Sequence, residues 1–212
     1  MYRYYLFDFD YTLVNSESGI LGCFQRTLEH IGHDPVPDDA VRRTIGMPMP
    51  AAVGQVLQET DPQRISAFID IYREFANTYM TPGTFFYPET LPMLRSLQAA
   101  GARAAVISSK TSHRIAEKFA VDNVSGLVEF IIGCNEVTEL KPAPEGIQLA
   151  MQRFNAAPEE VLYIGDSIID AGAAQNAQVA FAGVTTGATS EAELAAWPHI
   201  AILKDLSAIP TL

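Results

Sequence analysis

The chain has 212 residues, of which 48% are hydrophobic and 18% charged, so it can bury a full core as one domain or as a core domain with a small insert. Its formal net charge of −11, with no basic cluster, argues against partners such as nucleic acid or an anionic membrane. No apolar run is long enough to cross a membrane, and the first residues lack the regions of a signal peptide. We therefore expect a cytoplasmic protein, either a monomer or a small homo-oligomer.

The first predicted element is a short buried strand that stops at two carboxylates. Residues 4–7 are aromatic or apolar, and Asp8 and Asp10 follow them. On a strand, the i, i+2 spacing points both acids to the same face. Two adjacent acids repel each other unless a cation or a shared proton holds them, so the pattern indicates a site. The alternative is an acidic strand end exposed to solvent.

A helical segment is expected next. Apolar side chains recur at helical spacing along this segment. Gly32 is a natural stop for the first helix, and Pro62 is a natural start for the fourth. The four predicted helices cover residues 16–31, 38–45, 51–59 and 62–79. Residues 15–82 hold no convincing strand, so we expect them to form a small helical domain. Residues 1–14 and 83–212 would then form the core domain.

From Tyr87 onward, short apolar strands alternate with helices. The predicted strands cover residues 104–107, 130–132, 161–164, 179–184 and 200–203. A capping box formed by Ser190 and Glu193 predicts a short helix before the last strand. This alternation indicates an α/β fold with a parallel sheet that is covered on both faces. Ligands bind such sheets at the carboxyl ends of the strands, where this chain has its polar residues.

A second pair of acids follows a later strand. Asp166 lies at the predicted strand end, and Asp170 lies one helical turn beyond it. Mg²⁺ prefers carboxylate and carbonyl oxygens, which Asp8 and Asp166 could supply from neighbouring strands. The alternative is that Asp166 only caps the following helix.

Ser108 and Lys141 are candidate phosphate ligands. Ser108 ends one predicted strand and precedes a helix, so its hydroxyl and nearby backbone N–H groups could hold a phosphate oxygen, although a simple helix cap is the alternative. Lys141 opens the segment 141–144, which two prolines stiffen. A lysine is commonly a solvated surface charge, but one held near clustered acids can neutralise a phosphoryl group.

Taken together, these motifs resemble a known family. In chain order they are Asp8-Phe9-Asp10-Tyr11-Thr12, Ser108, Lys141 and Gly165-Asp166-Ser167-Ile168-Ile169-Asp170. They resemble the four motifs of the haloacid dehalogenase superfamily, and the helical insert resembles that family's C1 cap. Within it, segments 141–144 and 165–167 are most similar to the phosphoglycolate phosphatase-like branch. The resemblance implies a Rossmann-like parallel sheet core with helices on both faces and an inserted α-helical C1 cap domain.

The resemblance also implies a Mg²⁺-dependent phosphatase that acts on a small phosphorylated metabolite through an aspartyl-phosphate. Asp8 would be the nucleophile, with Asp10 the general acid and then the general base. Asp10 must carry a proton to act as an acid, which neighbouring negative charge would favour. The implied phosphate ligands are Thr12, Ser108, Ser109 and Lys141, the last also catalytic. The implied metal site consists of Asp8, Asp166, the Asp10 backbone carbonyl and, in a supporting position, Asp170.

Three residues depart from the family's pattern. Tyr11 stands where a glycine is usual, Ser109 where asparagine is common and Asn15 where aspartate is common. None of the three removes a proposed chemical group. Asp10 itself argues against the dehalogenase and phosphonatase branches, which as a rule lack an acid at this position.

Other activities would use the same catalytic residues. An inorganic pyrophosphatase or a sugar-phosphate mutase of the same superfamily differs only in the cap, where the candidate specificity residues are Arg42, Arg43, segment 46–49 and the aromatic segment 85–87. A third hypothesis is a non-catalytic binding module. This hypothesis predicts the loss of at least one catalytic group, and none is lost.

Overall fold

Short apolar runs form a six-stranded parallel sheet in the computed structural model, which describes residues 2–212. Across the sheet the strands are β5 (Ile131–Ile132), β4 (Arg103–Ile107), β1 (Tyr4–Phe7), β6 (Val161–Gly165), β7 (Ala180–Val184) and β8 (Ala201–Leu203). Each neighbouring pair runs parallel. The strand nearest the start of the chain therefore lies in the middle of the sheet.

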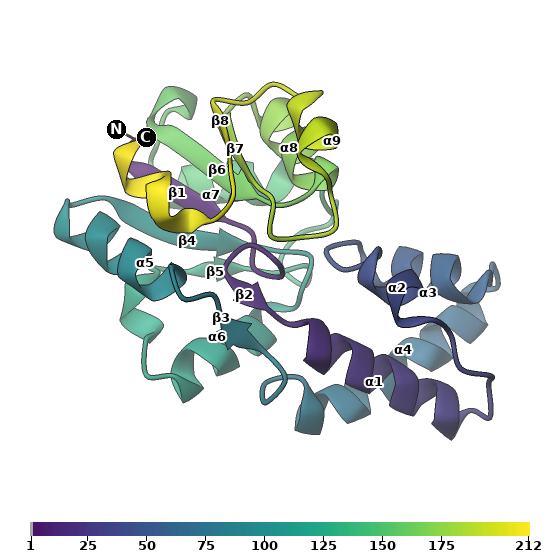
Figure 1. Cartoon of the computed structure of the whole chain (residues 1–212). Coiled ribbons are helices and arrows are strands. Elements are labelled where there is room, and N and C mark those ends of the chain that lie inside the picture. Colours follow the sequence, from purple (N-terminus) through teal and green to yellow (C-terminus); the bar gives the residue numbers. More distant parts are fainter. Residues whose placement is uncertain (1) are drawn as a thin grey trace.

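Helices cover both faces of this sheet (Figure 1). One face packs against α5 (Thr90–Ala99), α6 (Ser112–Val121) and η3 (Leu206–Thr211), and the other against α7 (Glu145–Phe154), α8 (Ile168–Ala177) and α9 (Glu191–Ala195). Along β1, Tyr5 and Phe7 enter the first core, whereas Tyr4 and Leu6 enter the second. Because both faces are buried, the strands are apolar throughout, and the expected α/β fold class is confirmed.

The remaining helices of the first half form a bundle beside the sheet (Figure 1). They are α1 (Glu17–His30), α2 (Asp38–Arg42), α3 (Met49–Leu57) and α4 (Pro62–Tyr79). The bundle has its own hydrophobic cluster, which includes Phe24, Leu28, Val53 and Phe68. This separate core supports the predicted division near residues 15 and 82, which stays a prediction.

Sequence patterns located these elements to within a few residues, with some exceptions. The expected second helix ends at Arg42 instead of Ile45. An antiparallel ribbon of β2 (Val14–Asn15) and β3 (Phe85–Phe86) joins the bundle to the core and was not expected. The short 3-10 helices η1 (Ser125–Leu127) and η2 (Pro158–Glu160) were also missed. Elements of two or three residues are too short to show a hydrophobic period.

The sheet order brings the predicted motifs to one edge. Register pairs Phe7 with Val106 on one side and with Ile164 on the other, so the residues that follow β1, β4 and β6 emerge at the same level. Ligands bind parallel sheets at such carboxyl ends. Within residues 2–212, no helix combines the length and the apolar composition needed to span a bilayer.

Candidate active site

Asp8 is the first residue beyond β1 and lies at the centre of the polar cluster. Its side chain is buried, and its backbone N–H donates to the Ile164 carbonyl over 2.9 Å. The Lys141 Nζ atom lies 2.9 Å from Asp8 Oδ1. This contact is an ion pair without hydrogen-bond geometry, because Oδ1 has no hydrogen-bond partner among the described residues. Burial raises the pKa of Asp8 to about 6, and Lys141 opposes that rise.

Lys141 is fixed in place by two groups from β6 and α8. Its Nζ donates to Asp170 Oδ1 over 2.6 Å and to the Tyr163 hydroxyl over 3.0 Å. The Tyr163 hydroxyl in turn lies 2.9 Å from the same Asp170 oxygen and 3.2 Å from the Ile107 carbonyl. Burial alone would lower the pKa of Lys141, but Asp170 and Asp8 raise it well above its usual value. The lysine is therefore a positioned cation facing the candidate nucleophile.

Asp170 was expected near the metal site, and the structure places it beside Asp8 with both of its oxygens engaged. Besides the two bonds on Oδ1, Oδ2 accepts from the Ser167 hydroxyl over 2.6 Å and from the Ser167 backbone N–H over 3.2 Å. These two bonds complete the capping box at the start of α8. This fully engaged carboxylate orients Lys141, and its supporting role at a metal site stays a prediction.

Asp166 is buried at the end of β6 and faces the other acids. The Thr12 hydroxyl donates to its Oδ1 over 3.2 Å. The backbone of Gly187 lies close by, and a Cβ added there would come within 1.8 Å of Asp166 Oδ2. Burial, and then the charges of Asp170 and Asp8, raise the pKa of Asp166 well above its usual value. Thr12 therefore contacts a carboxylate here, although the sequence placed it among the phosphate ligands.

This arrangement fits a divalent cation. Carboxylate oxygens of Asp8, Asp166 and Asp170 all lie within 4.8 Å of one another, and all three residues are buried. Asp8 Oδ1 has no hydrogen-bond partner among the described residues, and Asp166 has one hydroxyl donor there. Such clustered acids disfavour each other's charged form, which a hard cation with oxygen ligands relieves. The donor set suits Mg²⁺.

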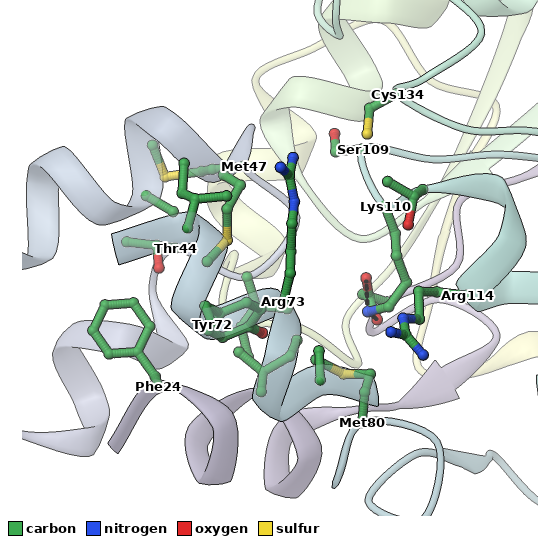
Figure 2. A pocket seen from close by; sticks show the side chains of 18 of the residues that line it. Phe24, Thr44, Met47, Tyr72, Arg73, Met80, Ser109, Lys110, Arg114 and Cys134 are labelled. Carbon is green, nitrogen blue, oxygen red and sulfur yellow. Dashed lines mark hydrogen bonds and ion pairs between the residues drawn. The ribbon is translucent and has the colours of Figure 1, made fainter. Parts of the chain in front are cut away.

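Asp10 has a neighbour that sequence reasoning missed. Lys110 Nζ donates to Asp10 Oδ1 over 2.7 Å and to Oδ2 over 2.9 Å (Figure 2). The group in closest contact with Asp10 is therefore a cation, and Asp8 is the neighbouring acid. Lys110 lies two residues after Ser108, just beyond β4, and this position was the one indication in the sequence that it could belong to the site.

Ser108 and Ser109 follow directly after β4 and precede Lys110. Ser108 is buried, and its hydroxyl accepts from the Lys110 backbone N–H over 3.3 Å. The buried Ser109 hydroxyl has no hydrogen-bond partner among the described residues. A donor without a partner at this edge is available to an incoming oxygen.

Tyr11 explains why a glycine is usual at its position. Its backbone has φ = 59°, the left-handed conformation that glycine adopts at least cost. The side chain is buried, and its hydroxyl donates to Glu17 Oε2 over 2.9 Å. Glu17 also accepts from Arg42 over 2.7 Å, so the loop after the candidate nucleophile is connected to the bundle.

A cavity of about 240 Å³ lies between the bundle and the core. Asp10, Ser109 and Lys110 line it on the core side, and α1, α2, α3 and α4 line it on the other. Segment 46–49 contributes Met47 and Met49, and its role in specificity stays a prediction. The other candidate specificity residues lie outside the cavity lining. Arg42 and Arg43 are not among its lining residues, and neither is the aromatic segment 85–87, in which Phe86 packs edge-on against Phe119.

Comparison with known families decides the assignment. The family described as "Haloacid dehalogenase-like hydrolase" matches residues 5–184. The chain belongs to this family. The expected membership is thus confirmed, and the protein is a haloacid dehalogenase-like hydrolase.

Named relatives extend over nearly the whole hydrolase. The phosphoglycolate phosphatase of Rhodobacter capsulatus is 32% identical, covering 97% of this chain and 94% of that protein. Pyrophosphatase PpaX of Listeria innocua is 29% identical, covering 95% of this chain and 92% of that protein. A crystal structure of a haloacid dehalogenase-like hydrolase from Bacteroides fragilis superimposes with a TM-score of 0.95 at 41% identity, covering 99% of this chain and 100% of that one. The resemblance to phosphoglycolate phosphatases is therefore confirmed.

Proposed function

We propose that this hydrolase is a Mg²⁺-dependent phosphatase that acts on a small phosphomonoester through an aspartyl-phosphate on Asp8. The observation that carries the proposal is the buried Asp8 carboxylate, paired with Lys141 at 2.9 Å and grouped with Asp166 and Asp170. The phosphoglycolate phosphatase relatives support the same class of substrate. A cytoplasmic location and a monomer or small homo-oligomer remain predictions.

Charge cancellation is the first requirement of this chemistry. A carboxylate and a phosphate dianion repel each other, so positive charge must surround both before their atoms approach. Lys141 supplies one charge next to Asp8. Mg²⁺, bound by Asp8, Asp166 and the Asp10 carbonyl, would supply further positive charge at the phosphoryl oxygens. The hydroxyls of Ser108 and Ser109 are the donors nearest to the end of β4 and would orient the phosphoryl group.

The reaction then proceeds in two displacements. An Asp8 oxygen attacks phosphorus, the bond from phosphorus to the leaving oxygen breaks, and Asp10 gives its proton to that oxygen. In the second displacement Asp10 takes a proton from water, whose oxygen attacks the phosphorus. The bond to Asp8 breaks and inorganic phosphate leaves. Asp10 accepts one hydrogen bond from Lys110 on each carboxylate oxygen, and the second lone pair of each oxygen stays available for proton exchange with substrate or water.

Pyrophosphate hydrolysis is a second candidate. The relatives named PpaX favour it, with 29% identity over 95% of this chain. Both activities would use the same Asp8, Asp10 and Lys141. They differ in the leaving group, which is a second phosphate in one case and an alcohol in the other.

A panel assay tests the proposed function. Phosphate release is measured from small phosphate esters and pyrophosphate, with Mg²⁺ and with a chelator, for wild type and Asp8→Asn. Turnover should require Mg²⁺ and fall by about 10⁴-fold or more in the variant, because an amide is a poor nucleophile and a poor Mg²⁺ ligand. The exposed Asp34→Asn serves as the matched control and should keep full activity. Full activity in Asp8→Asn would remove Asp8 from the proposed role.

A further inference from the structure

The cavity between bundle and core has two unlike walls. The bundle wall is apolar, with Phe24, Ile69, Tyr72 and Met80 among its residues and Met47 at its edge. Figure 2 shows Phe24, Met47 and Tyr72 on the bundle side, facing Ser109, Lys110 and Arg114 on the core side. A wall of this kind binds the apolar part of a ligand, while the few polar groups opposite fix its orientation.

The cavity is continuous with the proposed phosphatase site. Asp10, the residue proposed to protonate the leaving oxygen, lines the cavity together with Ser109 and Lys110. The leaving oxygen must lie within hydrogen-bond reach of Asp10 during that proton transfer. The organic part of the ester, attached to this oxygen, is therefore directed towards the cavity.

Charge in the cavity argues against a second anionic group on the substrate. The three arginine and lysine side chains that line it each have an acidic partner among the described residues. Arg73 pairs with Asp70 at 3.3 Å, Arg114 with Glu117 at 2.8 Å, and Lys110 with Asp10. These three acids balance the three cations, so the arginine and lysine side chains of the lining carry no unbalanced positive charge that would favour a second carboxylate or phosphate.

The size of the cavity exceeds what a two-carbon acid fills. A cavity of about 150 Å³ lined by apolar side chains binds benzene in another protein. At ~30 Å³ per water-sized group, a cavity of about 240 Å³ holds about eight such groups. Glycolate and a second phosphate are both smaller and more polar than this space.

We propose that the substrate is a phosphomonoester whose leaving group has an uncharged, apolar body of about eight non-hydrogen atoms, held against the bundle wall by residues that include Met47 and Tyr72. This inference rests on the proposed phosphatase function and narrows its substrate class. If it is right, neither phosphoglycolate nor pyrophosphate is the preferred substrate of this hydrolase.

A series of n-alkyl phosphates from ethyl to decyl tests the inference, because charge and leaving-group chemistry stay constant along it. The value of kcat/KM should rise by about four-fold for each added methylene and level off at about eight carbons, when the cavity is full. A series that is flat, or that favours ethyl phosphate, 2-phosphoglycolate or pyrophosphate, would overturn it.

Two tryptophan variants locate the effect. Met47→Trp places an indole in the cavity and should lower the ratio of kcat/KM for octyl over ethyl phosphate by about ten-fold. Gln55→Trp places the same indole on the exposed side of α3, outside the cavity, and should leave that ratio unchanged. Equal ratios in both variants and wild type would contradict the assignment of this cavity.

Binding separates this inference from the proposed function. Alkylphosphonates of the same lengths cannot be hydrolysed at the carbon–phosphorus bond, and calorimetry measures their affinity in the presence of Mg²⁺. Affinity that rises with chain length in wild type and not in Met47→Trp supports the cavity assignment. If no ester is turned over in that case, only the proposed phosphatase activity is refuted. Turnover of esters with affinity independent of length refutes the cavity assignment alone.

Discussion

The two regions that meet at the cavity are built in opposite ways. At the sheet edge, Lys141 contacts Asp8, Asp170 and Tyr163 at 2.6–3.0 Å, and the oxygens of Asp170 are fully engaged. In the bundle, the wall facing the core is apolar and leaves a space of about 240 Å³. The first region is organised before any substrate arrives, whereas the second has room that its own side chains do not fill.

This difference separates chemistry from substrate choice. Preorganised charges stabilise the reacting atoms of any phosphate ester and do not distinguish one ester from another. An apolar cavity distinguishes leaving groups by size and polarity and has little effect on the reacting phosphorus. Changes at the sheet edge should therefore affect all substrates by the same factor, and changes in the bundle should alter their ratio.

The largest effect is expected from Lys141→Ala. The variant leaves Asp8 and Asp170 buried without their cation, so kcat/KM should fall by about 10³-fold for every alkyl phosphate alike. Breaking a buried ion pair should also lower the free energy of unfolding by about 3–5 kcal/mol, measured by urea denaturation.

Lys118→Ala is the matched control for this variant. Lys118 is also buried and pairs with Asp122 at 3.0 Å, but on α6 and away from Asp8. The free energy of unfolding of Lys118→Ala should fall, while its kcat/KM per folded molecule stays the same. A loss at Lys141 that depended on chain length would mean that the two regions are not separate.

A smaller effect is expected from Gly187→Ala. The added Cβ would come within 1.8 Å of Asp166 Oδ2, so the carboxylate must move. Mg²⁺ affinity, measured by titrating activity with the metal, should fall by about 10–100-fold with no change in the octyl to ethyl ratio. At Gly126, an added Cβ meets no atom within 4 Å, so Gly126→Ala should leave the titration unchanged. Unchanged Mg²⁺ affinity in Gly187→Ala would argue against Asp166 as a ligand.

Tyr11→Phe should have the smallest effect of the three. It removes one hydrogen bond from the hydroxyl to Glu17, although Glu17 keeps its ion pair with Arg42. The free energy of unfolding should fall by about 1 kcal/mol, with both kcat/KM and the substrate ratio nearly unchanged. The exposed Tyr79→Phe controls for loss of a hydroxyl alone. A changed substrate ratio in Tyr11→Phe would show that this contact couples the loop to the cavity.

The sequence was informative where local patterns control structure. Buried strands of four or five residues, such as Tyr4–Phe7, end at polar residues, so the edge at which Asp8 and Asp166 meet could be predicted. The ribbon of Val14–Asn15 with Phe85–Phe86 could not, because two residues per strand carry no periodic signal.

Contacts between distant segments were the main omissions. In the sequence, Tyr163 looks like one more apolar residue of a buried strand. Its hydroxyl nevertheless accepts a hydrogen bond from Lys141, which lies 22 positions away in the chain. Lys110 reaches Asp10 across 100 positions, and Gly187 approaches Asp166 only because β6 and β7 are neighbours. The cavity depends on how four helices pack against the core, which no single segment specifies.

The most direct test of the central claim is to look for phosphate on Asp8. A single turnover of octyl phosphate with Mg²⁺ is quenched in acid at successive times, and the peptide containing Asp8 is analysed by mass spectrometry. Our account predicts one phosphoryl group on Asp8 that forms before inorganic phosphate appears and then decays as phosphate is released. Phosphate released while the Asp8 peptide stays unmodified, or with the phosphoryl group on another residue, would contradict it.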